Sequence, residues 1–181
     1  VQMMKDRLKA NAVPICLPIG KEDTFCGIID LVANDSIIYH DDLGKDFTVG
    51  PIPAEYADKA AEARQALMEV CAEQDDALME KFFETGELSP EEMKAAIRKG
   101  TLAMKINPVL CGSSYKNRGV QHLLDAIVDY LPSPIDVDHV KGVNPDTDVE
   151  EIRKTDDEEP FAGLAFKRVA DPFVGKLAYF R

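Results

Sequence analysis

Residues 106–120 of this chain read Ile-Asn-Pro-Val-Leu-Cys-Gly-Ser-Ser-Tyr-Lys-Asn-Arg-Gly-Val. The apolar run Ile106 to Cys111 predicts a buried strand, and a tight loop then leads into the first turn of a helix. A strand that enters a helix through a short loop is the basic unit of α/β folds, and such loops present backbone N–H groups to ligand oxygens. An ordinary strand-to-helix turn explains the same residues.

The helix after this loop is predicted from about Asn117 to Tyr130. Pro132 and Pro134 end it, because proline cannot continue the helical hydrogen bonds. Its apolar face has helical spacing and consists of Val120, Leu123, Leu124, Ile127 and Val128.

The N-terminal part of the chain reads as the tail of a helix up to Leu8, followed by strands. The β-branched and apolar runs lie at residues 12–19, 25–32, 36–40 and 46–49. The turn Asp41-Asp42-Leu43-Gly44 between the last two runs predicts a hairpin. It also matches the Asp-x-x-Gly pattern of GTPases, but a tight turn explains these residues better.

Between Ala54 and Glu92 the chain carries twelve acidic and three basic residues. Helical periodicity predicts one amphipathic helix from Pro53 to about Glu84, with apolar residues on one side. The opposite side is a narrow acidic stripe of Glu62, Glu69, Glu73, Asp76 and Glu80. Ser89, Pro90 and Glu92 form a capping-box pattern that opens a second helix, which Gly100 is expected to end.

The rest of the chain is polar and then strand-like. Residues 136–158 are predicted to be a linker with one extended stretch, and residues 161–169 and 176–180 a hairpin around Asp171 to Gly175. The fold class is therefore α/β: an α+β portion with a small mixed or antiparallel sheet and amphipathic helices, then the start of a β-barrel.

Composition excludes several functions. The net charge of −12 argues against direct nucleic-acid binding by this region. No apolar run reaches the roughly 20 residues of a membrane span, and the first residues lack a signal-peptide layout, so we expect a cytoplasmic protein. The four cysteines form no CxxC pair and are expected to be free, buried thiols, and the three histidines have no metal-site spacing.

A P-loop needs glycine five residues before a Gly-Lys-Ser/Thr sequence. Three Gly-Lys pairs occur, but none continues with serine or threonine, and Ile15, Tyr39 and Ala170 occupy the first-glycine positions. The sequence therefore predicts no catalytic residue, no metal ligand and no bound cofactor in these 181 residues.

Several motifs together resemble elongation factor G, a translational GTPase. They are the Pro-Val-Leu-Cys-Gly-Ser run at 108–113, Asp-Tyr-Leu-Pro-Ser-Pro at 129–134, Asp-Pro-Phe-Val-Gly at 171–175, and Leu-Pro-Ile-Gly at 17–20. The resemblance implies that residues 1–10 end a GTPase-domain helix and that 11–105 form the G′ insert. Residues 106–135 would then end the GTP-binding domain, 136–158 form a linker, and 159–181 begin the β-barrel domain II.

The resemblance also implies site residues. The family's fifth guanine-nucleotide motif falls on Gly112, Ser113 and Ser114, whose backbone amides would contact guanine only in a full-length parent that binds GTP and Mg. Serine at 114 departs from the family's alanine. The family's remaining GTPase motifs are absent from the chain, so we expect these residues alone not to hydrolyse GTP.

By its position, the acidic helix resembles the part of the G′ insert that contacts the C-terminal domain of the ribosomal stalk protein. This implies a ribosomal-stalk docking region led by Glu69, Glu73 and Asp76, with the ribosome and the rest of the parent chain as further partners. A ribosome-recycling paralogue, release factor three, or an acidic protein-interaction module unrelated to GTPases remain alternatives.

Overall fold

The computed structural model describes residues 1–136, 139–144 and 146–181. The chain divides into two compact units, Val1–Leu131 and Pro132–Arg181. The sequence segments expected at 1–10 and 11–105 lie in the first unit together with most of 106–135. Their separate assignment to a GTPase domain and an insert stays a prediction.

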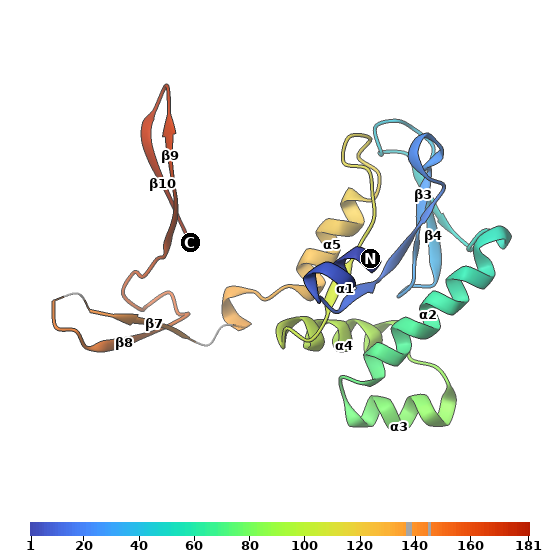
Figure 1. Cartoon of the computed structure of the whole chain (residues 1–181), viewed down its shortest axis with the longest axis horizontal. Coiled ribbons are helices and arrows are strands. Elements are labelled where there is room, and N and C mark those ends of the chain that lie inside the picture. The colour runs from blue at the N-terminus through green and yellow to red at the C-terminus, as the bar shows by residue number, and fades with distance from the viewer. Residues whose placement is uncertain (137–138, 145) are drawn as a thin grey trace. The chain divides into compact units, whose positions relative to one another are not determined.

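The first unit mixes helices with two small sheets (Figure 1). Its elements are α1 (Gln2–Leu8), β1 (Ala12–Pro14), β2 (Cys16–Ile19), β3 (Gly27–Asp30), β4 (Asp35–Tyr39), β5 (Phe47–Gly50), α2 (Ala57–Ala72), α3 (Asp76–Thr85), α4 (Pro90–Leu102), β6 (Asn107–Val109) and α5 (Val120–Tyr130). Strands β2 to β5 form an antiparallel meander, and β1 pairs in parallel with β6. The positions of the predicted strands and the mixed α/β class are confirmed. The run from Ile106 to Cys111 was expected to be buried, but only Ile106 is; Asn107 is exposed and the others are half-buried.

The core of this unit lies between the strands and helices α2, α4 and α5. Ile29 from the meander, Leu67 from α2 and Ile97 from α4 are among its fully buried side chains. Arg64 of α2 donates hydrogen bonds to the carbonyls of Leu31 and Val32 just after β3. These bonds fix α2 against the end of β3, since an unpaired carbonyl near the core would cost stability.

The single helix predicted from Pro53 to Glu84 is wrong. The chain leaves helical geometry at Asp75, which has an extended backbone and caps the start of α3 by accepting a hydrogen bond from the Ala77 amide (3.1 Å). Figure 1 shows α2 and α3 as separate helices running in different directions. Periodicity did not reveal the break because apolar residues of both helices, such as Leu67 and Phe82, contact the same core.

Helix α4 begins as predicted. The Ser89 hydroxyl accepts from the Glu92 amide (3.3 Å), and the Glu92 carboxylate accepts from the Ser89 amide (2.8 Å). We expect Ser89→Ala to lower the free energy of unfolding by about 1 kcal/mol, because one amide of the first turn loses its acceptor. Urea unfolding followed by circular dichroism measures this, and Ser89→Asp, which can still cap the helix, should restore most of the loss.

Helix α4 ends at Leu102, two residues beyond the predicted stop at Gly100. Gly100 is buried inside the helix, and a Cβ atom there would lie 2.9 Å from Ile106 Cδ1 and 3.0 Å from Gln74 Oε1. The glycine therefore allows close packing rather than a helix end.

The apolar face of α5 is largely exposed in this structure. The side chains of Leu123, Leu124, Ile127 and Val128 are exposed, whereas Ala126 and Tyr130 are buried in the core. Lys94 and Arg98 of α4 hold this orientation: Lys94 pairs with Asp129 (2.9 Å), and Arg98 donates to the Asp129 and Leu131 carbonyls. Helix α5 therefore packs on α4 by a flank of its apolar face.

The second unit consists of two antiparallel hairpins. One pairs β7 (His139–Val143) with β8 (Glu150–Lys154), and the other pairs β9 (Ala165–Asp171) with β10 (Gly175–Phe180); a short 3-10 turn covers Pro134–Asp136. The predicted C-terminal hairpin is confirmed. The linker predicted at 136–158 is instead mostly the β7–β8 hairpin; residues 137, 138 and 145 of that segment lie outside the described residues.

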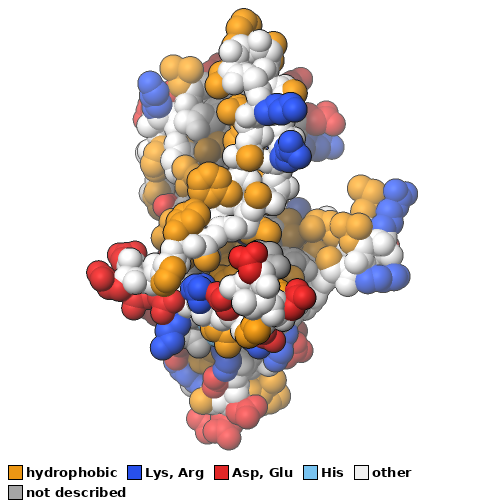
Figure 2. Space-filling view, turned by 90° about the vertical axis from the view of Figure 1, so that its left-hand side faces the viewer, with side chains coloured by type: hydrophobic (Ala, Val, Ile, Leu, Met, Phe, Trp, Pro, Cys, Tyr) orange, Lys and Arg blue, Asp and Glu red, His pale blue; other side chains and the backbone are white. Residues whose placement is uncertain are grey.

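Each hairpin has only two strands, too few to cover its apolar side chains. Phe161, Phe173 and Phe180 are all exposed, and Figure 2 shows hydrophobic side chains gathered at the surface of the molecule. The described strands close no barrel, so the start of a β-barrel stays a prediction.

Candidate functional site

The loop between β6 and α5 is a closed turn. The Ser113 amide donates to the Arg118 carbonyl (2.8 Å), the Arg118 amide donates back to the Ser113 carbonyl (3.0 Å), and the Asn117 amide donates to the Ser114 carbonyl (3.2 Å). Gly112 lies against this turn, since a Cβ atom there would be 2.8 Å from the Arg118 carbonyl oxygen. The loop therefore has a defined backbone rather than an open, adaptable one.

Arg118 is the central side chain of this site, and no motif in the sequence predicts that role. It is buried, and it donates to the carbonyls of Phe25 (2.7 Å) and Asp41 (2.8 Å) and to the Asp42 carboxylate (3.2 Å). A guanidinium satisfies several acceptors at once because its donors form a rigid planar fork. Arg118 thus joins the loop to two segments that flank strands of the antiparallel meander.

The Asp41–Gly44 turn packs on the same loop. Desolvation is the largest single effect on the pKa of Asp41 and raises it, but hydrogen bonds from several backbone amides, including that of Lys45 (3.0 Å), together hold the pKa below its usual value. Gly44 has a positive φ of 63°, and a Cβ atom would meet the Asn117 carbonyl oxygen at 2.1 Å. The geometry therefore supports the interpretation of Asp-x-x-Gly as a tight turn.

Tyr39 also holds the loop between β6 and α5 in place. Its hydroxyl accepts from the Gly119 amide (2.8 Å) at the start of α5, and the Gln121 side-chain amide donates to the Gly44 carbonyl (2.8 Å). Strand β4, the turn after it and α5 thus hold the loop from one side. These long-range bonds carry no signal in the local sequence.

The structure divides the predicted guanine-contact residues. The Ser113 amide donates to the Arg118 carbonyl inside the loop (2.8 Å), so in this structure it is not free for a ligand, and its guanine contact stays a prediction. The Gly112 and Ser114 amides make no hydrogen bond within the described part of the chain, and both residues are exposed. Backbone recognition of a ligand oxygen would therefore fall to Gly112 and Ser114.

The five predicted acidic contact residues are all exposed. Glu62, Glu69 and Glu73 share one side of α2 and its C-terminal cap, whereas Asp76 and Glu80 lie on α3. The single stripe expected from one long helix is thus two short acidic faces. The two faces are adjacent in the sequence, but they lie on helices that run in different directions because the chain turns at Asp75.

Other acidic residues of the same region form ion pairs. Asp75 of the α2–α3 turn pairs with Lys99 of α4 (2.6 Å), and Glu92 of α4 pairs with Lys81 of α3 (2.6 Å). Hydrogen bonds from these lysines hold the pKa values of Asp75 and Glu92 below their usual range. Within residues 1–136, 139–144 and 146–181, the five contact residues form no such pair.

An exposed aromatic residue lies within the acidic face of α3. Phe83 is 79% exposed, and at helical spacing it falls on the same side as Asp76 and Glu80. The sequence carried a visible signal for it, because an aromatic residue interrupts an otherwise polar helix face. Aromatic side chains surrounded by charge are frequent anchors of protein interfaces.

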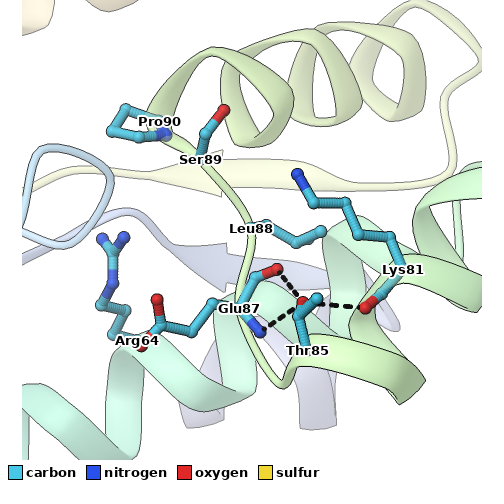
Figure 3. Close-up of a pocket in the computed structure, with 7 residues that line it drawn as sticks. All are labelled: Arg64, Lys81, Thr85, Glu87, Leu88, Ser89 and Pro90. Atoms are coloured by element: carbon cyan, nitrogen blue, oxygen red, sulfur yellow. Dashed lines mark hydrogen bonds between the residues drawn. The ribbon is translucent and has the colours of Figure 1, made fainter.

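A shallow hollow lies where α3 is linked to α4 (Figure 3). Arg64 and Lys81 line it, and the Thr85 hydroxyl bonds both to the Lys81 carbonyl (2.8 Å) and to the Glu87 backbone. Both cations already have partners, since Arg64 binds backbone carbonyls and Lys81 binds Glu92. The hollow therefore offers no free charge to an anionic ligand.

Two further expectations concern metals and membranes. The described residues contain no cluster of His, Cys, Asp and Glu with the geometry of a metal site. His122 lies 3.7 Å from Asp30 in a half-buried pair.

None of the helices in the part of the chain that the structure describes combines the length and apolar character needed to cross a membrane.

Comparison with solved structures shows the same fold in another protein. The chain is similar to a protein from Thermus thermophilus whose crystal structure is known, with 26% identity and a TM-score of 0.71. The two share a fold. The match covers 99% of this chain but 24% of the Thermus chain, so this chain spans about a quarter of that protein's length. No protein-family model matches the chain.

Proposed function

We propose that the acidic faces of α2 and α3 are a docking surface for a basic protein domain, the C-terminal domain of the ribosomal stalk protein. The observation that carries this proposal is the division of the acidic residues into two groups. Asp75 and Glu92 pair with lysines and stabilise the fold, whereas the five contact residues are exposed and form no ion pair with any residue that the structure describes.

Unpaired like charges one helical turn apart repel one another and destabilise the helix that carries them. Glu69 and Glu73 stand four residues apart at the C-terminal end of α2, and Asp76 and Glu80 have the same spacing on α3. A cationic partner would relieve this repulsion, and its charge would speed the encounter. The exposed Phe83 ring would add apolar contact area at the centre of such an interface.

The proposed parent is elongation factor G, the GTPase that drives translocation on the cytoplasmic ribosome. This proposal rests on the order of the motifs in the sequence, and GTP and Mg would be bound mainly by residues outside this chain. Gly112 and Ser114 would supply backbone contacts to guanine, and Ser113 would do so once its amide releases the Arg118 carbonyl. A ribosome-recycling paralogue or release factor three would use the same docking surface.

The docking proposal is tested by titrating the ¹⁵N-labelled chain with the isolated stalk C-terminal domain. We expect amide shifts that cluster on Glu62 to Glu80 and weaken as salt is raised, because exposed charges are screened beyond about 8–10 Å at physiological ionic strength. Absence of shifts at low salt would contradict the proposal. Shifts outside α2 and α3 alone would move the docking surface elsewhere.

An acidic interaction module unrelated to GTPases would show the same salt dependence with many basic proteins. Lysozyme, a basic protein of unrelated structure, is therefore the control titrant. Binding to the stalk domain that exceeds binding to lysozyme at moderate salt favours specific docking. An Asn-Lys-x-Asp motif in the coding sequence upstream of Val1 would favour the GTPase parent over the unrelated module.

A further inference from the structure

Two of the four cysteines are in contact, although they are 95 positions apart in the sequence. The Sγ atoms of Cys16 and Cys111 are 3.5 Å apart, and the Cys111 amide donates to Cys16 Sγ (3.2 Å). The parallel pairing of β1 with β6 brings them together: Pro14 is level with Val109, and each cysteine follows two residues later. The Ile15 amide continues this pairing by donating to the Val109 carbonyl (3.0 Å).

The two thiols differ in environment. Cys16 is buried, whereas Cys111 is partly exposed at the start of the loop. The hydrogen bond between the two thiols lowers the pKa of Cys111, and the same bond together with burial raises the pKa of Cys16. Cys111 is therefore the thiol that ionises first and meets solvent, which are the two requirements for reaction with an oxidant.

The other two cysteines have no such arrangement. The Cys26 thiol lies 3.8 Å from the Ile19 carbonyl, and the buried Cys71 thiol lies 3.9 Å from the Met93 carbonyl. Burial raises the pKa of Cys71 to about 12. All four thiols are free, as expected, but only Cys16 and Cys71 are buried, whereas Cys26 and Cys111 are half-buried.

We propose that Cys16 and Cys111 form a reversible disulfide when the protein meets hydrogen peroxide. The Cys111 thiolate attacks one peroxide oxygen, the O–O bond breaks, and Cys111 becomes a sulfenic acid while the other oxygen leaves as hydroxide and takes a proton. The Cys16 sulfur then attacks the Cys111 sulfur, and the sulfenic oxygen leaves as water with the Cys16 proton. Two thiols and one peroxide give one disulfide and two waters, and a dithiol reductant reverses the reaction.

Closing the bond shortens the sulfur separation from 3.5 Å to about 2.05 Å. The backbone next to Cys111 has little freedom to absorb this movement, because Gly112 packs against the Arg118 carbonyl and Gly119 lies against the Cys111 carbonyl. Since the residues next to Cys111 cannot take up the movement locally, we expect the disulfide to shift the backbone of the loop that carries Gly112 and Ser114. This inference is independent of stalk docking, since the acidic contact residues belong to α2, its C-terminal cap and α3, whereas Cys16 is in β2 and Cys111 follows β6.

The experiment treats the whole chain with hydrogen peroxide under native conditions and maps its peptides without reduction by mass spectrometry. The expected product is a peptide pair joining Cys16 to Cys111 with the loss of two hydrogen atoms, and dithiothreitol should release it. The same treatment in urea should lose this selectivity, because the contact exists only in the folded chain. Amide shifts at Gly112 to Ser114 should accompany the native reaction.

Three variants separate the roles. Cys16→Ser should leave Cys111 to proceed to sulfinic acid, since no neighbouring thiol traps the sulfenic acid. Cys111→Ser should leave Cys16 unoxidised, and Cys26→Ser, the matched control, should still form the disulfide. Circular dichroism checks that each variant is folded. Native protein that gives only over-oxidised Cys111 beside a free Cys16 thiol, or mainly other disulfides, would overturn the proposal.

Discussion

Replacing Arg118 by methionine is expected to lower the free energy of unfolding of this chain's first unit by about 2 kcal/mol, because the carbonyls of two half-buried residues each lose a donor. The carbonyls of Phe25 and Asp41 would lose their guanidinium donors, at 2.7 and 2.8 Å respectively. Methionine keeps most of the apolar stem of arginine, so the loss reflects the hydrogen bonds more than a cavity. Urea unfolding followed by circular dichroism measures the difference.

Two controls define the Arg118 result. Arg118→Lys keeps the charge but has a single ammonium group, which cannot reach both carbonyls in the same fork, so it should recover only part of the loss. Arg7→Met removes a charge from an exposed position of α1 and should leave stability within about 0.5 kcal/mol of the original protein. If Arg118→Met behaved like Arg7→Met, the proposed role of the guanidinium would be refuted.

Charge reversal on the docking surface is expected to have the second large effect. Changing Glu69, Glu73 and Asp76 to lysine should weaken binding to the stalk domain by a factor of at least ten. Like charges placed opposite each other across an interface cost several kcal/mol, so complete loss of measurable binding is within the expected range. The slope of affinity against salt should fall or reverse sign, because attraction has been replaced by repulsion.

A matched control separates position from net charge. Asp23, Glu55 and Glu87 are exposed acidic residues outside the two acidic faces, and changing all three to lysine alters the net charge by the same amount. This control should retain most of the affinity at moderate salt, where only nearby charges act strongly. Equal losses in the two triple variants would show that total charge alone governs binding, and the docking surface would then be withdrawn.

Local chemistry in the sequence accounts for many of the elements. The Ser89 to Glu92 pattern marks the start of α4 because a capping box depends only on residues three positions apart. The turns at Asp41–Gly44 and Asp171–Gly175 were likewise visible, because each begins with aspartate and ends with glycine. Each of these features is held by bonds between near neighbours, so the sequence alone predicts it.

The predictions for α2, α3 and α5 fell short where long-range packing determines the structure. One helix was predicted where α2 and α3 form two, because both halves contact the same core and the apolar period continues through Asp75. Periodicity identified the apolar side of α5 correctly but could not say which flank α4 would cover. A hydrophobic pattern specifies which residues are apolar, and packing partners determine which of them are buried.

The same division holds for the two sites. The sequence by itself determined that the region from Ala54 to Glu92 is strongly acidic and that a strand–loop–helix unit carries Gly112 to Ser114. Only the tertiary structure distinguishes the lysine-paired Asp75 from the unpaired Glu73. It also places the Arg118 side chain in a buried position beside the loop and brings Cys16 into contact with Cys111. Charge and helix period are properties of neighbouring residues, whereas these contacts exist only because distant strands and helices pack together.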